Sequence, residues 1–275
     1  MDGNNKKVVV ITGASSGIGK ALAYEYAQQN FQVVIAARNL NSLQAIEKDL
    51  KENNAECLAV KTDVTIEKEC ENLIEESVRK FGKIDVFINN AGISMRARFV
   101  DLKLEVIEKI MNVNFWGTVY CTKYAMPYLL KTKGSLVGVI SIAGYMGLPG
   151  RSAYSASKYA VRGFLDTLRI ESRAQGVHVL VAAPGFTASN IRSAALDAHG
   201  NAQGKSPRKE EKMMSAEKVA VKIRQAIQKR KPELILTFLE GKLAVFLKKT
   251  FPRYLDRLVL KQMAKEPDSP LKNSK

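Results

Sequence analysis

Two side chains near the middle of the chain are spaced so that they could transfer a proton together. Tyr154 and Lys158 stand four positions apart, which places both on one face of a helix. A nearby ammonium group favours the phenolate, so we expect Lys158 to lower the pKa of Tyr154 from its ordinary value of about 10 toward neutrality. Ser141 stands thirteen positions before the tyrosine and could hydrogen-bond a carbonyl oxygen. The spacing predicts acid–base chemistry at a carbonyl or alcohol group.

Asn114 could extend this group by holding a water molecule that carries protons onward. It falls within residues 104–131, which we predict to form one long helix. Each of these four residues, taken alone, is more often structural than catalytic. Their combination, with Ser141 at the end of a predicted strand and the Tyr–Lys pair on a predicted helix, favours the catalytic interpretation.

A glycine-rich turn, TGASSGIG at residues 12–19, predicts a phosphate site. Glycine lets the backbone turn tightly and approach a phosphate without a Cβ in the way. The helix that follows offers unpaired N–H groups and the positive end of its dipole. The alternative is a glycine-rich turn with no ligand. The residues that we expect to contact a dinucleotide here are Gly13, Ser15, Ser16, Gly17, Ile18 and Gly19.

The end of the second predicted strand indicates which dinucleotide binds. NAD sites usually carry a carboxylate there, which binds the ribose hydroxyls. In this chain residues 36–39 read AARN, and the guanidinium of Arg38 suits a 2′-phosphate in charge and geometry. We therefore expect NADP(H). The alternative is that Arg38 is simply solvated at the surface.

Two further strand ends could complete a cofactor site. Asp63 could accept a hydrogen bond from an adenine amino group, or it could cap the next helix. Small residues after the fourth predicted strand would let a cofactor lie across the strand end, although Asn89 could instead tie neighbouring strands together, because buried amides need partners. The expected contacts at these two strand ends are Asp63, Val64, Asn90, Ala91 and Gly92.

The order of elements predicts an α/β fold with a doubly wound parallel sheet. Strand-like runs alternate with helical segments, and runs that are apolar along their whole length are typical of strands buried on both faces. Right-handed crossovers then place helices on both sides of the sheet. The predicted strands are residues 7–13, 32–37, 56–62, 85–89, 135–141, 177–183 and 233–237, and the predicted helices are residues 17–30, 40–53, 67–81, 104–131, 155–174 and 216–231.

Over about residues 5–237 the chain resembles the short-chain dehydrogenase/reductase family. The matching motifs are TGASSGIG at residues 12–19, NNAG at residues 89–92, Asn114, Ser141, YSASK at residues 154–158 and PG at residues 184–185, in the family's order and spacing. The resemblance implies a Rossmann-type sheet of seven strands and hydride transfer between a nicotinamide and a carbonyl or alcohol.

The same resemblance implies a role for each matching residue. Tyr154 would be the general acid in reduction, and Lys158 would bind the nicotinamide ribose. Ser141 would orient the substrate oxygen, and Asn114 would support a water relay. The family commonly forms homodimers or homotetramers through the helices that here carry Asn114 and Tyr154. The residues expected beside the nicotinamide amide are Pro184, Gly185 and Thr187.

The extent of the resemblance divides the chain into a catalytic domain, residues 1–237, and a basic extension, residues 238–275. Residues 1–200 carry 24 Lys+Arg and 19 Asp+Glu, whereas residues 201–275 carry 19 and 8, so +11 of the net charge of +16 lies in the last quarter. Within the first part, the polar residues 190–215 predict a lid over the substrate site.

In the extension, apolar residues recur every three or four positions between basic ones, and Pro252 separates two short helical segments. This pattern favours amphipathic helices that lie on an anionic membrane surface. The alternative is a pair of helices packed on the body or on a second subunit. The residues of the apolar stripe are Leu243, Phe246, Leu247, Phe251, Leu255, Leu258, Val259 and Met263.

These features together predict the NADPH-dependent reduction of a ketone on a hydrophobic, lipid-like substrate. The AARN strand end and the extension are most similar to membrane-associated family members such as the 3-ketodihydrosphingosine reductases and hydroxysteroid dehydrogenases. One alternative is a soluble 3-oxoacyl-carrier-protein reductase, and another is a non-enzymatic module that senses NADP. We expect no nucleic-acid partner, because the basic residues lack interleaved aromatic side chains.

Several classes of site are disfavoured by the composition. Three widely spaced cysteines predict neither a disulfide framework nor a metal site, and neither histidine has the neighbours of a catalytic triad. No segment reads as a signal peptide or as a membrane-spanning helix. We therefore expect a cytoplasmic protein, either free or peripherally bound to a membrane.

Overall fold

The computed structural model describes residues 6–187, 190–204, 206 and 213–272. Its centre is a sheet of seven strands in the order β3-β2-β1-β4-β5-β6-β7, and every neighbouring pair is parallel. The predicted α/β fold with a Rossmann-type doubly wound sheet is confirmed. The strands are β1 (Val8–Thr12), β2 (Gln32–Ala37), β3 (Cys57–Lys61), β4 (Val86–Asn89), β5 (Ser135–Val139), β6 (His178–Ala183) and β7 (Glu233–Ile235).

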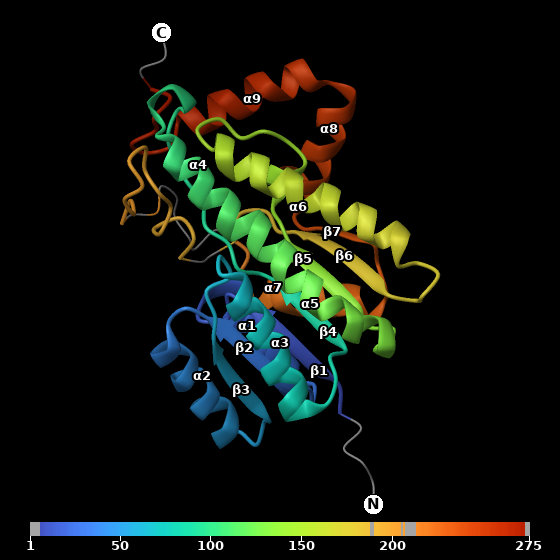
Figure 1. Ribbon diagram of the computed structural model, residues 1–275. Helices are drawn as coiled ribbons and strands as arrows, with labels where there is room; N and C mark the ends of the chain where they lie inside the picture. The colour runs from blue at the N-terminus through green and yellow to red at the C-terminus, as the bar shows by residue number, and fades with distance from the viewer. Residues whose placement is uncertain (1–5, 188–189, 205, 207–212, 273–275) are drawn as a thin grey trace, which may run out of the picture.

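Helices cover both faces of the sheet, as the apolar strands require. The buried side chains of α1, α2 and α7 pack on one face, and those of α3, α5 and α6 pack on the other, where α5 and α6 lie in front of the sheet in Figure 1. The helices of the catalytic region are α1 (Gly17–Gln28), α2 (Leu40–Glu52), α3 (Glu67–Phe81), α4 (Leu104–Met111), α5 (Gly117–Thr132), α6 (Ser152–Glu171) and α7 (Ala216–Gln228).

The strand order reverses direction at β1, because β2 lies on one side of it and β4 on the other. Helices from the two halves leave the sheet on opposite faces at this point. A crevice therefore forms beyond the carboxyl ends of β1 and β4, which is where α/β sheets of this kind bind ligands. Both the glycine-rich turn and the NNAG motif follow these two strands.

The predicted long helix over residues 104–131 is present, but it is not α-helical throughout. A π-helical turn, Asn112–Trp116, separates α4 from α5 and contains Asn114. The residues on each side of the π turn keep helical periodicity, and the shift of phase that the extra residue causes is too local to stand out in the sequence pattern. Such turns are frequent at functional sites, because the extra residue changes the direction of a side chain.

Most other predicted elements are present with ends that differ by one to three residues, which is usual for helix and strand termini. The difference that matters is at α6, which begins at Ser152 rather than at residue 155. Tyr154 therefore lies within the first turn of this helix. The predicted lid, residues 190–215, falls partly outside the described residues, and its described part packs on the body through a bridge between Leu196 and Met95.

The C-terminal extension consists of a π-helical segment (Phe238–Leu243), α8 (Ala244–Thr250) and α9 (Pro252–Ala264). The break at Pro252 is as predicted. One side of α8 and α9 packs on the body, as the alternative prediction had it, because Val245, Leu255 and Met263 are buried. In the described residues, no helix has the length and apolar content needed to cross a membrane.

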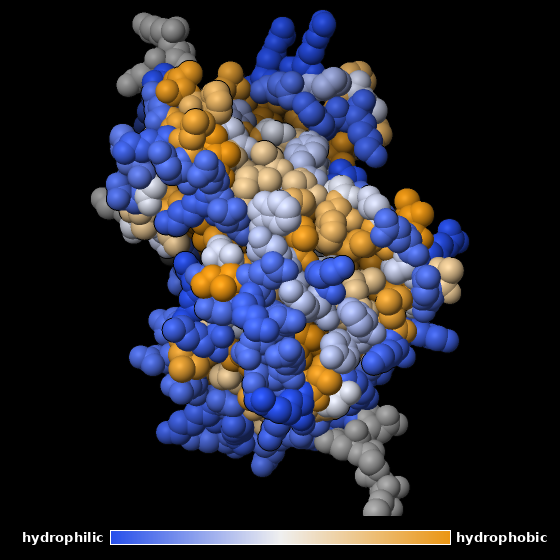
Figure 2. Space-filling view, in the orientation of Figure 1, coloured by the Kyte–Doolittle hydropathy of each residue, from blue (hydrophilic) through white to orange (hydrophobic). Residues whose placement is uncertain are grey.

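The other side of the extension carries exposed aromatic and aliphatic side chains. Figure 1 places α8 and α9 at the same end of the molecule as the start of α4. In Figure 2, where hydrophilic residues cover most of the visible face, hydrophobic residues gather over this end. The large apolar residues exposed by 40% or more in these two regions are Phe99, Val100, Leu104, Phe246, Phe251, Tyr254, Leu258 and Leu260.

Candidate active site

The glycine-rich turn has the backbone geometry that a phosphate cradle needs. Gly13 and Gly17 have φ angles of +65° and +54°, which side chains other than hydrogen rarely allow. A Cβ on Gly19 would lie 2.3 Å from the carbonyl oxygen of Gly13. The turn can therefore pass directly over the start of α1, with the first N–H groups of that helix facing the crevice.

Asn90 and Thr12 fix the two strand ends at this crevice. The Asn90 Nδ2 atom donates to the carbonyl oxygens of Thr12 and Gly13, at 3.0 and 3.1 Å. The Thr12 hydroxyl in turn accepts from the backbone N–H groups of Asn90 and Ala91, both at 3.1 Å. Thr12 is the first residue of the TGASSGIG motif, but it was not among the residues expected to form contacts at this site. Asn89 does not tie strands together, because its side chain donates to the Thr122 hydroxyl on α5.

A groove of about 770 Å³ runs along the ends of β1, β2, β3 and β4. This volume falls within the usual range for ligand sites. Gly19 lies beneath the turn rather than in the groove, and the exposed Arg38 lines the groove at the end of β2. The predicted contacts that line the groove are Gly13, Ser15, Ser16, Gly17, Ile18, Arg38, Asp63, Val64, Asn90, Ala91 and Gly92.

Asp63 lines the groove and also closes a turn. Its Oδ1 atom accepts from the N–H and the hydroxyl of Thr65, at 3.0 and 2.8 Å. The alternative prediction that Asp63 caps the next helix is wrong, because α3 begins at Glu67 and the cap position is Ile66. The carboxylate is therefore held three residues before the cap position, at the edge of the groove.

The proton-transfer residues lie in a second cavity that continues from this groove. Ile18, Asn90 and Gly92 line both spaces, so a molecule could extend from one into the other. Gly92 leaves room at the junction, because a Cβ there would fit tightly, 3.2 Å from Asn114 Oδ1 and 3.3 Å from Lys158 Nζ. The predicted residues that line the second cavity are Ser141, Tyr154, Lys158, Pro184, Gly185 and Thr187.

Comparison with known proteins identifies this arrangement. A profile described as short chain dehydrogenase matches residues 7–199. The chain belongs to the short-chain dehydrogenase/reductase family. It is 33% identical over 274 residues (97% of this chain and 84% of the relative) to "Dehydrogenase/reductase SDR family member 7B" of Rattus norvegicus. It is 42% identical over 184 residues to "11-beta-hydroxysteroid dehydrogenase-like 4A" of Arabidopsis thaliana, with coverage of 66% of this chain and 61% of that relative.

Solved structures agree with this assignment. An alcohol dehydrogenase from the archaeon Thermococcus sibiricus, complexed with 5-hydroxy-NADP, superposes with a TM-score of 0.75 at 26% identity, over 84% of this chain and 96% of the other. A Burkholderia phymatum family member in complex with NAD shares the fold, with a TM-score of 0.76 at 23% identity, over 96% and 95% of the two chains. The chain thus has the fold of this family, and family members bind NAD(H) or NADP(H). It spans about three fifths of the length of the first of these relatives, the Arabidopsis protein.

The glycine turn and the long groove fit a dinucleotide of this kind. The positive φ angles of Gly13 and Gly17 and the absent Cβ of Gly19 leave backbone at the surface where a pyrophosphate would lie. The groove then leads from the end of β2, where an adenosine ribose would bind, to the cavity that contains Tyr154.

In this short-chain dehydrogenase, Tyr154 and Lys158 are both buried, with exposed fractions of 8% and 4%. The Lys158 ammonium lies 5.8 Å from the centre of the Tyr154 ring and donates to the Val139 carbonyl oxygen at 3.1 Å. Burial lowers the pKa of Lys158 from 10.5 to about 8. The expectation that the neighbouring lysine makes the phenol more acidic is not met here, because burial raises the pKa of Tyr154 above 10.0.

Three other groups moderate this rise in the pKa of Tyr154. A hydrogen bond with the Ser141 hydroxyl lowers it, and so do the positive charges of Arg151 and Arg192. Ser141 is itself held at the start of a short turn, where its Oγ accepts from the Ala143 N–H at 3.2 Å. The environment therefore keeps Tyr154 protonated, as a proton donor must be.

Sequence reasoning missed the two arginines. Arg151 and Arg192 are each 6% exposed and line the cavity. Arg151 donates to the Ser94 hydroxyl at 3.3 Å and to the Met95 carbonyl oxygen at 3.4 Å, which links α6 to the loop after β4. No motif marks either residue: Arg151 directly precedes α6, three positions before Tyr154, and Arg192 reaches the cavity from a segment 38 positions after Tyr154.

Asn114 does not line the cavity, but it supports its wall from behind. Its side chain accepts from the Ile93 N–H at 2.8 Å and donates to the Ile93 carbonyl oxygen at 3.0 Å and to the Ser157 hydroxyl at 2.9 Å. Ser157 is fully buried and donates to the Tyr154 carbonyl oxygen at 2.8 Å. Sequence reasoning missed Ser157 as well, although it stands next to Lys158. Asn114 thus connects the π turn both to the loop after β4 and to the helix that carries Tyr154.

Proposed function

We propose that this chain is an NADPH-dependent reductase of ketones on hydrophobic substrates. The observation that carries the proposal is the buried Tyr154 phenol, which stands with Ser141 and Lys158 in a cavity that opens directly into the dinucleotide groove. A ketone in this cavity would have the groove on one side and a proton donor on the other. Reduction of a ketone needs a hydride from the cofactor in the groove and a proton from such a donor.

Each residue then has a defined task. NADPH, when bound in the groove, would be the source of the hydride that the carbonyl carbon needs. Tyr154 donates its phenolic proton to the carbonyl oxygen, so that the C=O double bond becomes a C–H and an O–H bond and the product is a secondary alcohol. Ser141 holds that oxygen beside the phenol, and the Lys158 ammonium binds ribose hydroxyls and offsets the charge left on Tyr154. Asn114 keeps the loop after β4 and α6 in register through its hydrogen bonds with Ile93 and Ser157.

Support for NADP(H) over NAD(H) comes from Arg38. It lines the end of the groove where the adenosine ribose would lie, and its guanidinium can form paired hydrogen bonds with a 2′-phosphate. Among the described residues, no carboxylate pairs with this guanidinium. Residues 36–39 also lack the acidic residue that would bind a ribose diol and repel a phosphate.

Support for a hydrophobic substrate comes from the walls of the cavity and from relatives. Apolar side chains supply much of the lining, including Leu148, Phe186 and Ile191. Relatives at 37–42% identity are named as 11-beta-hydroxysteroid dehydrogenases or as similar to them. We favour a lipid with a long-chain 3-keto group, such as 3-ketosphinganine, as the substrate class.

We further propose that α8 and α9 place the chain on an anionic membrane surface. Exposed Phe246, Phe251 and Tyr254 lie among basic residues of the same two helices. The test is flotation with vesicles of phosphatidylcholine and phosphatidylglycerol at low salt. Protein that stays at the bottom of the gradient with these vesicles would refute the proposal.

Self-association through α5 and α6 is proposed on similar grounds. Trp116, Tyr159 and Ile170 stand on or beside these helices and are 41–78% exposed. Light scattering after size exclusion should therefore give a dimer or tetramer, and Tyr159→Glu should weaken it. A monomer at micromolar concentration would contradict this assignment.

The reaction is tested by NADPH consumption with 3-ketosphinganine, a steroid ketone and a 3-oxoacyl-carrier-protein thioester. We expect turnover of the first or second, and a loss of at least about a hundredfold in kcat for Tyr154→Phe with an unchanged Kd for NADPH. Turnover of the carrier thioester alone would refute the lipid assignment. Full activity of Tyr154→Phe would refute the role of the phenol.

A further inference from the structure

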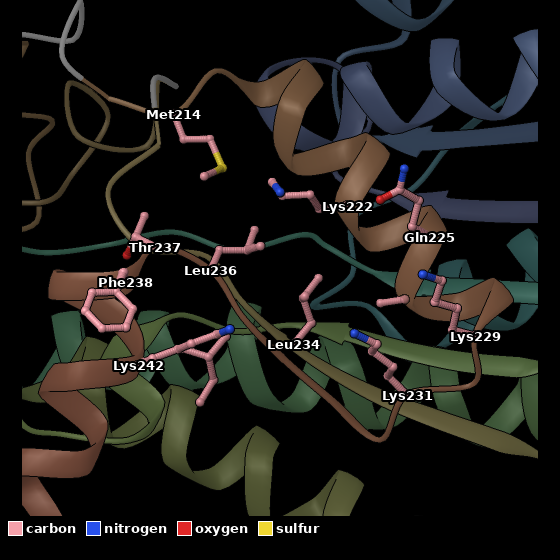
Figure 3. Close-up of a pocket in the computed structure, with 12 residues that line it drawn as sticks. Met214, Lys222, Gln225, Lys229, Lys231, Leu234, Leu236, Thr237, Phe238 and Lys242 are labelled. Carbon is pink, nitrogen blue, oxygen red and sulfur yellow. The ribbon is translucent and has the colours of Figure 1, made fainter.

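Apart from the groove and the catalytic cavity, a further pocket of about 360 Å³ lies at the β7 edge of the sheet, away from Tyr154. It is bounded by α7, by β7 and by the π-helical segment that follows β7. Figure 3 shows lysines on both sides of it, with Leu234 and Leu236 between them. The described residues that line the pocket are Met214, Lys222, Gln225, Ala226, Lys229, Lys231, Leu234, Ile235, Leu236, Thr237, Phe238 and Lys242.

The rim of this pocket is strongly cationic. Lys222 and Lys229 come from α7, Lys231 precedes β7, and Lys242 follows it, and all four are exposed. No acidic residue is found among the described residues that line the pocket. Like charges held around one concave space raise the free energy of the empty pocket, and a bound anion would lower it.

The interior of the pocket is apolar. Leu236 is only 5% exposed, and Ala226 and Leu234 also contribute to the surface. Phe238 extends this apolar surface outward and is 71% exposed. Inorganic phosphate would contact the lysines but leave this surface in water. A molecule with an anionic head and an apolar chain would satisfy both.

Thr237 is an unusual residue in the wall of the pocket. Its φ angle is +66°, a conformation that a β-branched residue rarely adopts. Its hydroxyl oxygen is buried and has no hydrogen-bond partner in the part of the chain that the structure describes. Strain and an unsatisfied polar atom of this kind are concentrated at functional sites.

Residues of this pocket pack against residues that line the catalytic cavity, although the two spaces are separate. A Cβ on Gly185 would lie 2.9 Å from the Thr237 hydroxyl, so Thr237 packs directly behind the turn that lines that cavity. Met214 forms a parallel bridge with Thr187, another cavity residue. Two walls of the lysine-lined pocket therefore back onto the loop beside the proposed nicotinamide position.

We propose that this lysine-lined pocket binds an amphiphilic anion, with a phosphate or carboxylate head held by Lys222 and Lys242 and an apolar chain laid on Leu234 and Leu236. The site is separate from the substrate cavity. The pocket is poorly suited to a second copy of this chain, because twofold contact through this face would bring two sets of four lysines together. The lysine-lined pocket contacts the loop of Gly185 and Thr187, so we expect the bound anion to change the affinity for NADPH. This last expectation rests on the proposed function, because it requires that the chain binds NADPH.

The binding test is calorimetry of the full chain with dodecyl phosphate below its micelle concentration, beside inorganic phosphate and dodecanol. We expect dodecyl phosphate to bind more tightly than either of the other two, and its Kd to rise with ionic strength. The double variant Lys222→Glu/Lys242→Glu should raise that Kd at least about tenfold. The double variant Lys80→Glu/Lys109→Glu makes the same change of charge on α3 and α4 and should leave the Kd unchanged.

The possible results separate the sources of the anion. Equal Kd values for the two double variants, or equal binding of dodecyl phosphate and inorganic phosphate, would overturn the proposal. Loss of dodecyl phosphate binding in the presence of phosphatidylglycerol vesicles, with flotation abolished by Lys222→Glu/Lys242→Glu, would assign the pocket to a lipid headgroup in the membrane. Binding that vesicles do not displace would assign it to a free amphiphile.

Coupling to the cofactor is measured separately by NADPH fluorescence with and without dodecyl phosphate. Linkage requires that the two ligands change each other's Kd by the same factor. An NADPH Kd that does not change would refute the coupling. If NADPH does not bind at all while dodecyl phosphate does, the proposed function fails and the anion site stands.

Discussion

The buried ion pair between Arg96 and Glu266 gives a quantitative test of how the C-terminal segment is held. Arg96 lies in the loop after β4, and its Nη2 atom donates to Glu266 Oε2 at 3.3 Å and to the Pro267 carbonyl oxygen at 2.7 Å. The two side chains are only 7% and 5% exposed. Glu266→Ala would leave the guanidinium buried without this carboxylate, whereas water would screen the loss of a surface pair.

The size of the effect follows from this burial. Removing one partner of a buried ion pair costs about 3–5 kcal/mol, and the lower end applies here because Arg96 keeps the Pro267 carbonyl as an acceptor. For a chain of this length, a loss of about 3 kcal/mol corresponds to a fall in Tm of about 6–12 °C. The double variant Arg96→Met/Glu266→Leu removes both charges and should recover most of that loss.

The assay is thermal unfolding followed by circular dichroism, with limited proteolysis of the same samples at 25 °C. Asp101→Ala is the matched control, because Asp101 pairs with Arg98 at 2.7 Å, a shorter distance, but both side chains are at least a third exposed. We expect little change in Tm for the control and early cleavage near Lys265 only in Glu266→Ala. A Glu266→Ala variant that melts with the control would refute the argument that burial, rather than distance, sets the strength of this pair.

Three further predictions concern the cofactor site. Arg38→Ala should raise the Kd for NADPH about tenfold and leave that for NADH unchanged, as fluorescence titration would show; an unchanged ratio would contradict the role of Arg38. Burial lowers the pKa of Lys158 to about 8, so between pH 8 and 10.5 the unfolded chain binds a proton that the folded chain does not. The free energy of unfolding of the wild type, measured with urea, should therefore rise by about 3 kcal/mol relative to that of Lys158→Met as the pH increases over this range. The same pH dependence for both proteins would show that Lys158 is not desolvated. Gly19→Ala should lower Tm and weaken NADPH binding, because its Cβ would lie 2.3 Å from the Gly13 carbonyl oxygen. Gly163→Ala is the control: a Cβ there meets open space, so Tm should stay the same or rise slightly. Similar effects of the two substitutions would contradict the argument that the turn needs the absent Cβ of Gly19.

Elements with a strong local pattern could be predicted from the sequence. The strands are apolar along their length because both faces are covered, and α3 begins and ends at the predicted residues, with Gly82 in the left-handed conformation after it. The glycine turn was equally clear, because only glycine satisfies its φ angles and close contacts. The family followed from motifs whose residues lie at the ends of these elements.

Side chains that act through long-range packing could not be predicted. The π turn at Asn112–Trp116 lies within a helix whose two parts each keep helical periodicity, so the sequence predicts the helix but not the turn. Arg151 and Arg192 carry no motif, yet both reach the cavity and affect the pKa of Tyr154. The direction of that pKa shift was also missed, because burial was not visible in the spacing of Tyr154 and Lys158.

The sequence by itself determined the order of strands and helices, the phosphate turn and the Tyr–Lys pair, since each of these depends on residues that are neighbours along the chain. Tertiary structure alone decided the burial of Tyr154, the pairing of Arg96 with a glutamate 170 positions away and the gathering of four lysines from three segments at the β7 edge. Hydrogen-bond geometry and helical periodicity act over a few residues and leave a local pattern. Desolvation and charge depend on which distant segments pack together, and no local pattern records that.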